Sequence, residues 1–283
     1  MFHLHKATQV TSGDDATVAP TGIDIGREET GSETLLLLAR QYLYPPRPAE
    51  GPGAQAPFVR ANMVASIDGA ATFAGRSGGL GGPGDKAVFR LLRGLADVIL
   101  VGAGTATTEG YRQPAADEVF AGLRDDNGQP PAPALALVSR SLSIPPDYPP
   151  LSHPDTVVLT CASAPADRRA ALVDAGATLV DCGDDTVETG EIIAACGRRE
   201  WARVLCEGGP HLLGSVIAAD LLDELCLTTS PFLAGGTAGR ITASPLPDGA
   251  EQALRGMSPA MIMTDDDGYV FTRWVRHGRS SIH

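Results

Sequence analysis

The strongest constraint on the fold comes from residues 98 to 219, where short apolar runs alternate with segments of helical periodicity. Val98 to Val101 is an unbroken apolar run, which is typical of a strand covered on both faces. Further strands are expected at 134–138, 156–159, 178–181 and 203–206, and helices at 166–175, 187–197 and 211–219. Repeated strand–helix–strand units predict an α/β fold with a mostly parallel central sheet flanked by helices.

A strand and two helices are expected before this stretch. A helix is predicted over 33–43 and a strand over 58–64. Asp85 is the expected cap of a second helix, whose leucines share one face. Residues 1 to 31 are rich in Thr, Gly, Asp and Glu and lack periodicity, so we expect a loose N-terminal arm.

The end of the chain has a different pattern. Strands are expected at 224–229, 260–263 and 269–275 without a helix between them, and Asp267-Gly268 predicts a hairpin-like turn between the last two. The sheet should therefore have an antiparallel edge. Because no boundary interrupts the pattern after residue 58, we expect residues 32 to 283 to form a single domain.

The composition argues against several classes of function. With 22 Lys and Arg against 34 Asp and Glu, the formal net charge is −12. Binding to nucleic acids or to anionic membranes is therefore not expected, because both need a basic face. Residues 1 to 15 lack the apolar core of a secretory signal, and no apolar run approaches the about 18 residues of a transmembrane helix.

The cysteines point to a reducing compartment. Their number is odd, their spacing is wide, and none forms a C-x-x-C pair. We therefore expect reduced, mostly buried thiols in a cytoplasmic protein. The cysteines are Cys161, Cys182, Cys196, Cys206 and Cys226.

The first candidate binding segment is ILVGAGT, which ends at Thr105. Gly102 and the small residues after it would let the backbone come close to a ligand. Thr105 could bind a phosphate through its hydroxyl and could also be the N-cap of a following helix. Thr107 stands where the dinucleotide fingerprint needs a third glycine. The alternative interpretation is a tight turn after a strand.

The second candidate segment is RVLCEGGPHLLGS, from Arg203 to Ser215. Gly208-Gly209 follows a strand, and Pro210 suits the first position of a helix. The free amides and the positive end of that helix would hold a pyrophosphate. Glu207 lies at the carboxyl end of the strand, where open α/β sheets bind ligands, and could accept hydrogen bonds from substrate hydroxyls. A sharp turn without a ligand is the alternative.

Three weaker candidates carry polar groups near strand ends or on a helix. Ser66 and Asp68 follow the first strand in NMVASIDG, although Asp-Gly is more often a plain turn. Ser139-Arg140 would suit a ribose 2′-phosphate, and a solvated loop is the alternative. Arg93 would clamp an anion if its helix face turned toward a cleft, and otherwise it is a solvated charge.

Several enzyme classes lack their motifs in this chain. The only lysines are Lys6 and Lys86, and neither belongs to a phosphate-binding G-x-x-x-x-G-K-[ST] loop. The G-x-S-x-G elbow of hydrolases is missing, and so are the His-x-Glu and C-x-x-C motifs of zinc deaminases. The six histidines show no metal-ligand spacing, so no metal site is expected.

Taken in order, these segments resemble the reductase domain of bifunctional riboflavin-biosynthesis enzymes and its stand-alone pyrimidine-reductase relatives. The resemblance spans about residues 58 to 276. It rests on NMVASIDG, the RSGG loop, LLRGLADVILVGAGT, the Ser139 strand end, RVLCEGGPHLLGS and DELCLTTSPFLAGG. It implies a dihydrofolate-reductase-like fold, NADPH as hydride donor and a homodimer. The implied reaction reduces the ribosyl carbon of 5-amino-6-(5-phosphoribosylamino)uracil to a ribityl chain.

The resemblance also implies roles for single residues. Substrate contacts are expected from Ser66, Ser77, Arg93 and Glu207, and Asp68 would position the reacting groups together with Glu207. Cofactor contacts are expected from Val64, Gly79, Gly102, Thr105, Glu109, Ser139, Arg140, Gly208, Gly209, Pro210, His211, Leu212, Leu213, Gly214 and Ser215.

The chain departs from the family pattern at four places. Gly79 stands where an aromatic residue is usual, Ala70 where a basic residue is usual, and Glu109 where Asp is usual. The arginine that usually binds the substrate phosphate has no aligned equivalent, although Arg112 could replace it from a shifted position. A charge-assisted contact of this kind contributes roughly 1.5–3 kcal/mol.

The leading hypothesis is an NADPH-dependent reductase of a pteridine- or pyrimidine-like substrate. The first candidate substrate is the riboflavin-biosynthesis intermediate named above. The cofactor would give a hydride to an imine or carbonyl carbon, Glu207 would hold sugar hydroxyls, and Asp68 or a water would supply the proton. Reduction of dihydrofolate or another pterin is the alternative on the same fold. A non-catalytic NADP-binding module is a second alternative, and a SAM methyltransferase is a distant third.

Overall fold

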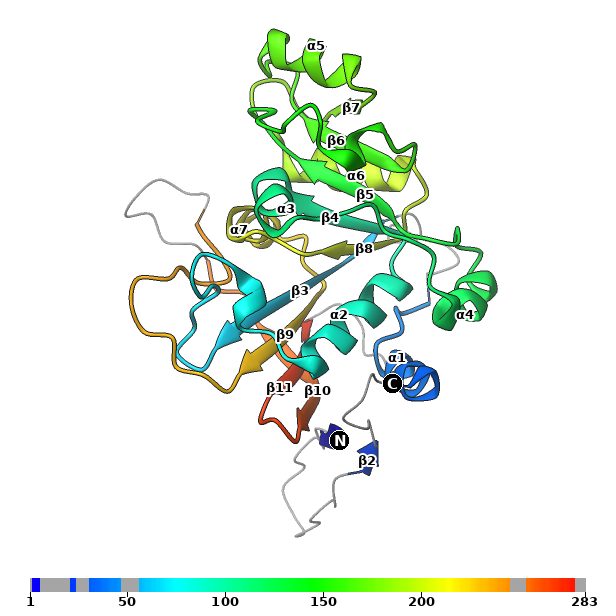
Figure 1. Cartoon of the computed structure of the whole chain (residues 1–283), viewed down its shortest axis with the longest axis vertical. Coiled ribbons are helices and arrows are strands. Elements are labelled where there is room, and N and C mark those ends of the chain that lie inside the picture. The colour runs from blue at the N-terminus through cyan, green and yellow to red at the C-terminus, as the bar shows by residue number, and fades with distance from the viewer. Residues whose placement is uncertain (1, 6–20, 24–30, 47–55, 245–252, 278–283) are drawn as a thin grey trace.

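An 11-stranded sheet runs through the centre of the computed structural model of this chain (Figure 1). The structure describes residues 2–5, 21–23, 31–46, 56–244 and 253–277. The strand order is β2-β1-β10-β11-β9-β3-β8-β4-β5-β6-β7. The predicted fold class is confirmed, because one long part of the sheet is parallel and the other edge is antiparallel.

The parallel part begins at β9 and ends at β7. Each neighbouring pair within it has parallel register; in the middle, Val98 lies opposite Val204 on one side and Ala134 on the other. Its strands are β9 (Glu224–Ser230), β3 (Phe58–Ser66), β8 (Arg203–Cys206), β4 (Val98–Gly102), β5 (Ala134–Val138), β6 (Thr156–Thr160) and β7 (Thr178–Asp181). The strands predicted from apolar runs are therefore confirmed, within one or two residues at their ends.

The antiparallel part lies on the other side of β9. It contains β11 (Val270–Arg276), β10 (Met257–Asp265), β1 (Phe2–His5) and β2 (Thr21–Ile23). The predicted turn between β10 and β11 is confirmed, and Gly268 has a φ of 84°, a conformation that favours glycine. The loose arm predicted over residues 1 to 31 needs a correction, because two of its segments pair with the sheet as β1 and β2. Most of the arm lies outside the described residues.

Seven helices are described along the chain. They are α1 (Ser32–Gln41), α2 (Pro83–Leu95), α3 (Ala103–Glu109), α4 (Ala121–Asp126), α5 (Ala166–Asp174), α6 (Thr189–Arg198) and α7 (Pro210–Ala218). The sequence did not predict α3 and α4, which are short. Asp85 does not cap α2, because the helix begins at Pro83 with Gly82 as its N-cap, which places Asp85 in the first turn.

The helices cover both faces of the sheet because the side chains of β4 alternate between two cores. Val98 and Leu100 pack with residues of α6 and α7 on one face. Ile99 and Val101 pack on the other face, with Ala106 of α3 and Leu172 of α5. On that second face, α1 and α2 pack over β8, β9 and the antiparallel strands. All five cysteines are free and buried, as the sequence predicted.

A buried ionic cluster ties the end of the first helix to the sheet. Arg60 on β3 and Arg273 on β11 hold the two carboxylate oxygens of Glu224, with Nε–O distances of 2.6 Å and 3.1 Å. The side chains of Arg60 and Glu224 are fully buried. Arg60 also donates to the carbonyl of Tyr42, just after α1. These contacts fix β3, which lines the site described next, against β9 and β11.

No described helix is long and apolar enough to cross a membrane.

Candidate active site

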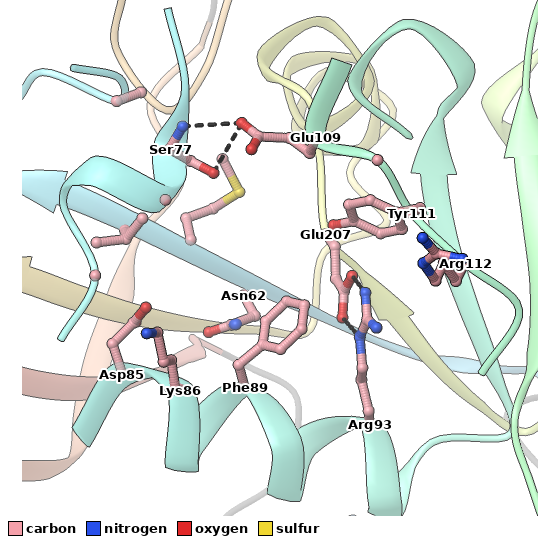
Figure 2. A pocket seen from close by; sticks show the side chains of 16 residues that line it. Asn62, Ser77, Asp85, Lys86, Phe89, Arg93, Glu109, Tyr111, Arg112 and Glu207 are labelled. Carbon is pink, nitrogen blue, oxygen red and sulfur yellow. Dashed lines mark hydrogen bonds and ion pairs between the residues drawn. The ribbon is translucent and has the colours of Figure 1, made fainter. Parts of the chain in front are cut away.

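A cavity of about 450 Å³ opens at the carboxyl ends of β3 and β8 (Figure 2). One wall is α2, and the opposite wall combines the glycine-rich loop that follows β3 with the segment that follows α3. The predicted site residues that line it are Val64, Ser77, Arg93, Glu109 and Glu207. The other lining residues are Asn62, Met63, Ala71, Gly78, Gly81, Asp85, Lys86, Phe89, Gly110, Tyr111 and Arg112.

The α2 wall presents Asp85, Phe89 and Arg93 to the cavity (Figure 2). These residues are four apart, and side chains at this spacing lie on one face of a helix. The predicted apolar face of α2 packs into the core, with Leu91 and Leu92 fully buried. The helix therefore turns its polar stripe toward the cavity, and of the two interpretations of Arg93 the cleft-facing one is confirmed.

Arg93 and Glu207 form a bidentate ion pair inside the cavity. Nε lies 2.8 Å from Oε1 and Nη2 lies 2.7 Å from Oε2. The Glu207 side chain is 2% exposed, and the guanidinium stacks over the rings of Phe89 and Tyr111 at 4.1 Å and 4.9 Å. Burial works to lower the pKa of Arg93, but the hydrogen bonds and charge of Glu207 raise it overall. The carboxylate is thus held in one orientation by two charge-assisted hydrogen bonds.

Tyr111 adds a hydroxyl to this pair. Burial raises its pKa well above the ordinary value, and the charge of Glu207 raises it further. The phenol therefore stays protonated and donates a hydrogen bond to Glu207. Each carboxylate oxygen has a second lone pair, so Glu207 can still accept a hydrogen bond from a ligand.

The glycine-rich loop is held against the segment after α3 by Glu109 (Figure 2). Its Oε1 accepts hydrogen bonds from the backbone N–H of Ser77 at 2.8 Å and from the Ser77 hydroxyl at 3.0 Å. Both residues line the cavity, but they contact each other. Glu109 thus closes one wall of the cavity, a role the sequence did not predict for it.

Asp85 and Asn62 are site residues that sequence reasoning missed. Asp85 was interpreted only as a helix cap, yet it lines the cavity and accepts a hydrogen bond from Thr228 on β9. Burial raises the pKa of Asp85 above its ordinary value. Asn62 is 9% exposed, and its Oδ1 has no hydrogen-bond partner among the described residues. The alternation along β3 could have indicated that Asn62 points the same way as Val64.

The two glycine segments predicted from the sequence meet beside this cavity. Because β4 and β8 are neighbours in the sheet, Gly102 comes next to Gly208 and donates its N–H to the Gly208 carbonyl at 2.7 Å. The peptide bond between Gly208 and Gly209 is cis. A Cβ on Gly209 would collide with the hydroxyl of Thr105. Thr105 lies inside α3, whose N-cap is Gly102, so it does not cap that helix.

The start of α7 projects from this meeting point. Pro210 is its first residue and Gly209 its N-cap, and the first helical hydrogen bond runs from the Leu213 N–H to the Gly209 carbonyl. The amides of His211 and Leu212 precede that bond, so the helix turns N–H groups toward the edge where Gly102 and Thr105 lie.

The later residues of the predicted cofactor run have other contacts. The side chains of Leu212 and Leu213 are buried in the core beneath α7. Gly214 packs so closely against the carbonyl of Ala243 that no side chain would fit, and the Ser215 hydroxyl donates to the His211 carbonyl. Only the backbone at the start of the run is placed to meet a cofactor.

Ser139 and Arg140 follow β5, the next strand along the same sheet edge. The Ser139 N–H donates to the carbonyl of Leu159, and Arg140 is exposed. Both lie beyond Gly102 on the side away from the cavity, because β5 pairs with β4.

Asp68 lies outside the cavity and holds two loops together. Its carboxylate accepts hydrogen bonds from the Ser66 hydroxyl and from the backbone N–H groups of Ala234 and Gly235. These bonds lower its pKa to about 2. Asp68 is therefore ionised at neutral pH and does not line the cavity, so the structure does not support the proton-supplying role predicted for it, which stays a prediction.

The loop after β3 and the loop after β9 make two further contacts. The Ile67 N–H donates to the Phe232 carbonyl, and the Ala71 N–H donates to the Gly239 carbonyl. Together with the Asp68 carboxylate, these bonds join residues 67–71 to residues 232–239. We call this unit the joined loops.

Gly79, predicted to contact the cofactor, does not line the cavity. It lies in the 3-10 turn Ser77–Gly79, and a Cβ there would come 3.3 Å from the ring of Phe73. Phe73 thus occupies space next to the position where the family usually has an aromatic residue. Among the described residues, no three His, Cys, Asp or Glu side chains gather as a metal site would require.

A comparison with family models matches residues 57–269 to the RibD C-terminal domain. The chain belongs to the RibD C-terminal domain family. This confirms the resemblance found in the sequence, and it makes the chain a member of a reductase family. A search of curated proteins finds no significant match.

Solved structures share the fold. A pyrimidine reductase-like protein from Corynebacterium diphtheriae is 26% identical, with a TM-score of 0.72, over 84% of this chain and 98% of that one. The riboflavin biosynthesis reductase Rib7 of Saccharomyces cerevisiae is 16% identical, with a TM-score of 0.58, over 86% and 99%. RibD of Acinetobacter baumannii is 18% identical, with a TM-score of 0.62, over 79% of this chain and 59% of its own length.

Proposed function

We propose that this chain is an NADPH-dependent reductase of a pyrimidine substrate, first of all the ribosylaminouracil phosphate of riboflavin biosynthesis. The observation that carries the proposal is the meeting of Gly102 with Gly208-Gly209 at the start of α7, directly beside the cavity that holds Arg93 and Glu207. A cofactor diphosphate at the helix start would direct the rest of the molecule toward that cavity.

The residues at the sheet edge fit such a cofactor. No side chain projects from Gly102, Gly208 or Gly209, so phosphate oxygens can come close to the backbone here and reach the amides at the start of α7. Thr105 brings a hydroxyl to the same place. Ser139 and exposed Arg140 lie further along the edge, where an arginine and a hydroxyl suit a ribose 2′-phosphate.

In the mechanism, NADPH when bound supplies the hydride. The chain supplies orientation: Arg93 fixes the Glu207 carboxylate, whose remaining lone pairs accept hydrogen bonds from the sugar hydroxyls of the substrate. Asp85 replaces Asp68 as the group that relays the balancing proton, because it lies in the cavity and burial raises its pKa.

Arg112 is the proposed anchor for the substrate phosphate. It lines the cavity on the side of Arg93 and is exposed (Figure 2). A guanidinium there would attract a doubly charged phosphate in a chain whose overall charge is −12. Arg112→Ala should raise KM about 10- to 100-fold for the phosphorylated substrate and leave the dephosphorylated one unaffected.

The cofactor proposal is tested by calorimetric titration with NADPH. Gly209→Ala places a methyl group against the Thr105 hydroxyl and should weaken binding at least tenfold. Gly122→Ala on α4 is the matched control, because a Cβ there meets nothing within 4 Å. Wild-type protein that fails to bind NADPH, or a Gly209→Ala variant that binds it as tightly as wild type, would contradict the proposal.

Reduction of a pterin is the second candidate. It is favoured by the partly buried carboxyl of Asp85 in the cavity, since a pterin has ring N–H donors and no phosphate to anchor. Loss of NADPH absorbance with dihydrofolate and with the aminouracil, measured in competition, distinguishes the two.

A further inference from the structure

A second, smaller cavity shares one wall residue with the candidate active site. Its volume is about 160 Å³, and it lies between the C-terminal half of α2, the helix α4, residues 114–117 and the prolines that precede β5. In the described structure, Arg93 is the only residue that lines both cavities. The proposed function makes no use of this second cavity.

The walls of the second cavity carry more positive than negative charge. Three guanidinium groups line it, those of Arg90, Arg93 and Arg124, together with a single carboxylate, that of Asp117. Asp117 is already paired with Arg90, with distances of 2.6 Å from Nε to Oδ2 and 3.0 Å from Nη2 to Oδ1. Arg93 is paired in the same manner with Glu207. The third guanidinium, that of Arg124, is bonded to no carboxylate among the described residues.

Arg124 is almost completely buried, with 2% of the residue exposed. Its Nε donates to the carbonyl of Pro130 at 2.6 Å. Its Nη1 donates to the carbonyls of Gly94 and Ala96 at 3.0 Å and 2.8 Å. Its Nη2 is buried and has no hydrogen-bond partner among the described residues. All the groups that hold this cation are therefore neutral, and one of its nitrogens has nothing to bond.

The surroundings of Arg124 do not neutralise its charge. Burial lowers its pKa, and the charge of Arg203 lowers it further, while the charge of Asp97 acts in the opposite direction. The carboxylate of Asp97 accepts hydrogen bonds from Gln129 and Arg203 instead. A guanidinium stays protonated in proteins, and a buried charge normally has a partner of opposite sign. A water molecule could bond to Nη2 but would bring no charge, so an anion is the partner that the site lacks.

The size of the cavity limits what that anion can be. A volume of about 160 Å³ is several times the roughly 30 Å³ of one water molecule in the liquid. It is smaller than the roughly 300 Å³ at which pockets for drug-sized ligands begin. Guanidinium groups match the oxygens of phosphates and carboxylates in geometry as well as in charge. The cavity therefore suits an oxyanion with only a few heavy atoms.

We propose that the second cavity binds a small oxyanion, a phosphate or a short carboxylate, through Arg124 together with Arg90 and Arg93. This ion is separate from the substrate phosphate, whose proposed anchor, Arg112, lines the first cavity. The inference does not rest on the proposed function, because it concerns charge and space in a cavity that the reaction does not use. Since α2 and α4 both contribute to the cavity, a bound oxyanion stabilises the folded protein by joining the two helices.

The experiment titrates the full chain with inorganic phosphate at constant ionic strength, in a buffer without other oxyanions. Calorimetry measures the dissociation constant, and we expect about 1 mM or lower, because charge-assisted bonds from several guanidinium groups are strong. At about 30 mM phosphate, Tm should then rise by about 4 °C. Sulfate and acetate, titrated in the same way, show whether the site takes a tetrahedral ion or a carboxylate.

The test variant fills the cavity and leaves Arg124 in place, because Arg124 also holds three backbone carbonyls. Ala115 is exposed and lines the cavity, so Ala115→Leu should weaken phosphate binding about tenfold or more and change Tm little without phosphate. Ala116→Leu is the matched control, because Ala116 is also exposed but does not line the cavity. Arg112→Ala is the second control, since it removes the cation proposed for the substrate phosphate. Both controls should bind phosphate as the wild type does.

Each outcome decides the inference. Weaker binding in Ala115→Leu, with both controls unchanged, would support it. A wild type that binds none of the three oxyanions saturably, or an Ala115→Leu variant that binds them as tightly as the wild type, would overturn it. Loss of binding in Arg112→Ala would place the ion in the first cavity and would overturn it as well. Because turnover and NADPH do not enter these measurements, the inference and the proposed function can fail independently.

Discussion

Replacing Glu224 by glutamine should destabilise the whole protein, because Glu224 is the only carboxylate contacting the two guanidinium groups of the buried cluster in the described structure. The side chains of Glu224 and Arg60 are 0% exposed, and that of Arg273 is 11% exposed. Glutamine preserves the shape and removes the charge, so two buried cations lose their partner.

The expected size follows from this burial. Removing one partner of a buried ion pair costs about 3–5 kcal/mol, since water cannot replace the missing charge. For a chain of this size, each kcal/mol shifts Tm by about 2 °C. Glu224→Gln should therefore lower Tm by about 6–10 °C.

The assay is thermal unfolding followed by circular dichroism, with urea midpoints as a second measure. The control is Glu191→Gln, because its partner Arg198 is 3.7 Å away and both side chains are about half exposed. A pair of that kind contributes about 0–1 kcal/mol. If Glu224→Gln and Glu191→Gln melted within about 2 °C of each other, the argument that burial makes the cluster costly to break would be refuted.

Three further predictions follow from the site and the core. Asp85→Asn should be more stable than wild type at neutral pH. Burial raises the pKa of Asp85 in the folded state above its ordinary value of 3.8, so the wild type loses stability as the pH rises from the ordinary pKa through the folded-state pKa. In thermal melts below about pH 4 the difference in Tm between the variant and the wild type should vanish. Glu207→Gln should raise substrate KM about 10- to 100-fold while the Kd of NADPH stays unchanged, and equal loss of both would contradict the assigned roles. Burial raises the pKa values of four buried thiols, for example to about 12 in Cys206, so iodoacetamide at pH 8 should label the thiols only after urea unfolding.

The fold could be read from the sequence because its strands are buried on both faces. Their apolar sequences predicted strands at Val98 to Val101 and at Arg203 to Cys206. In the structure these two strands are neighbours, and their register brings Gly102 beside Gly208. The short helix α3 was missed because its AGTATTE sequence has no apolar stripe. The pairing of residues 2–5 with β10 was missed because a lone edge strand leaves little periodicity in the sequence.

The site was only partly predictable for a related reason. Arg93 and Glu207 are 114 positions apart, and their roles could be proposed from strand ends, but their bidentate pairing depends on how α2 lies against β8. Asp85 was predicted to be only a helix cap, because a carboxylate near the start of a helix is already explained by capping. The loop-joining contacts of Asp68 could not be predicted for the converse reason, since its partners at 234 and 235 come from a distant loop. The homodimer and the cytoplasmic location stay predictions.

The joined loops have a consequence for anyone who engineers this protein. Residues 67–71 and 232–239 share one carboxylate and two backbone bonds, so they behave as a single mechanical body although more than 150 positions separate them. A mutation in residues 232–239 will therefore change the position of Ala71, which lines the cavity. A library that varies only one of the two segments leaves its bonded partner segment unchanged, and that partner limits which substitutions are accepted. Varying both segments together is therefore the better way to obtain a new specificity.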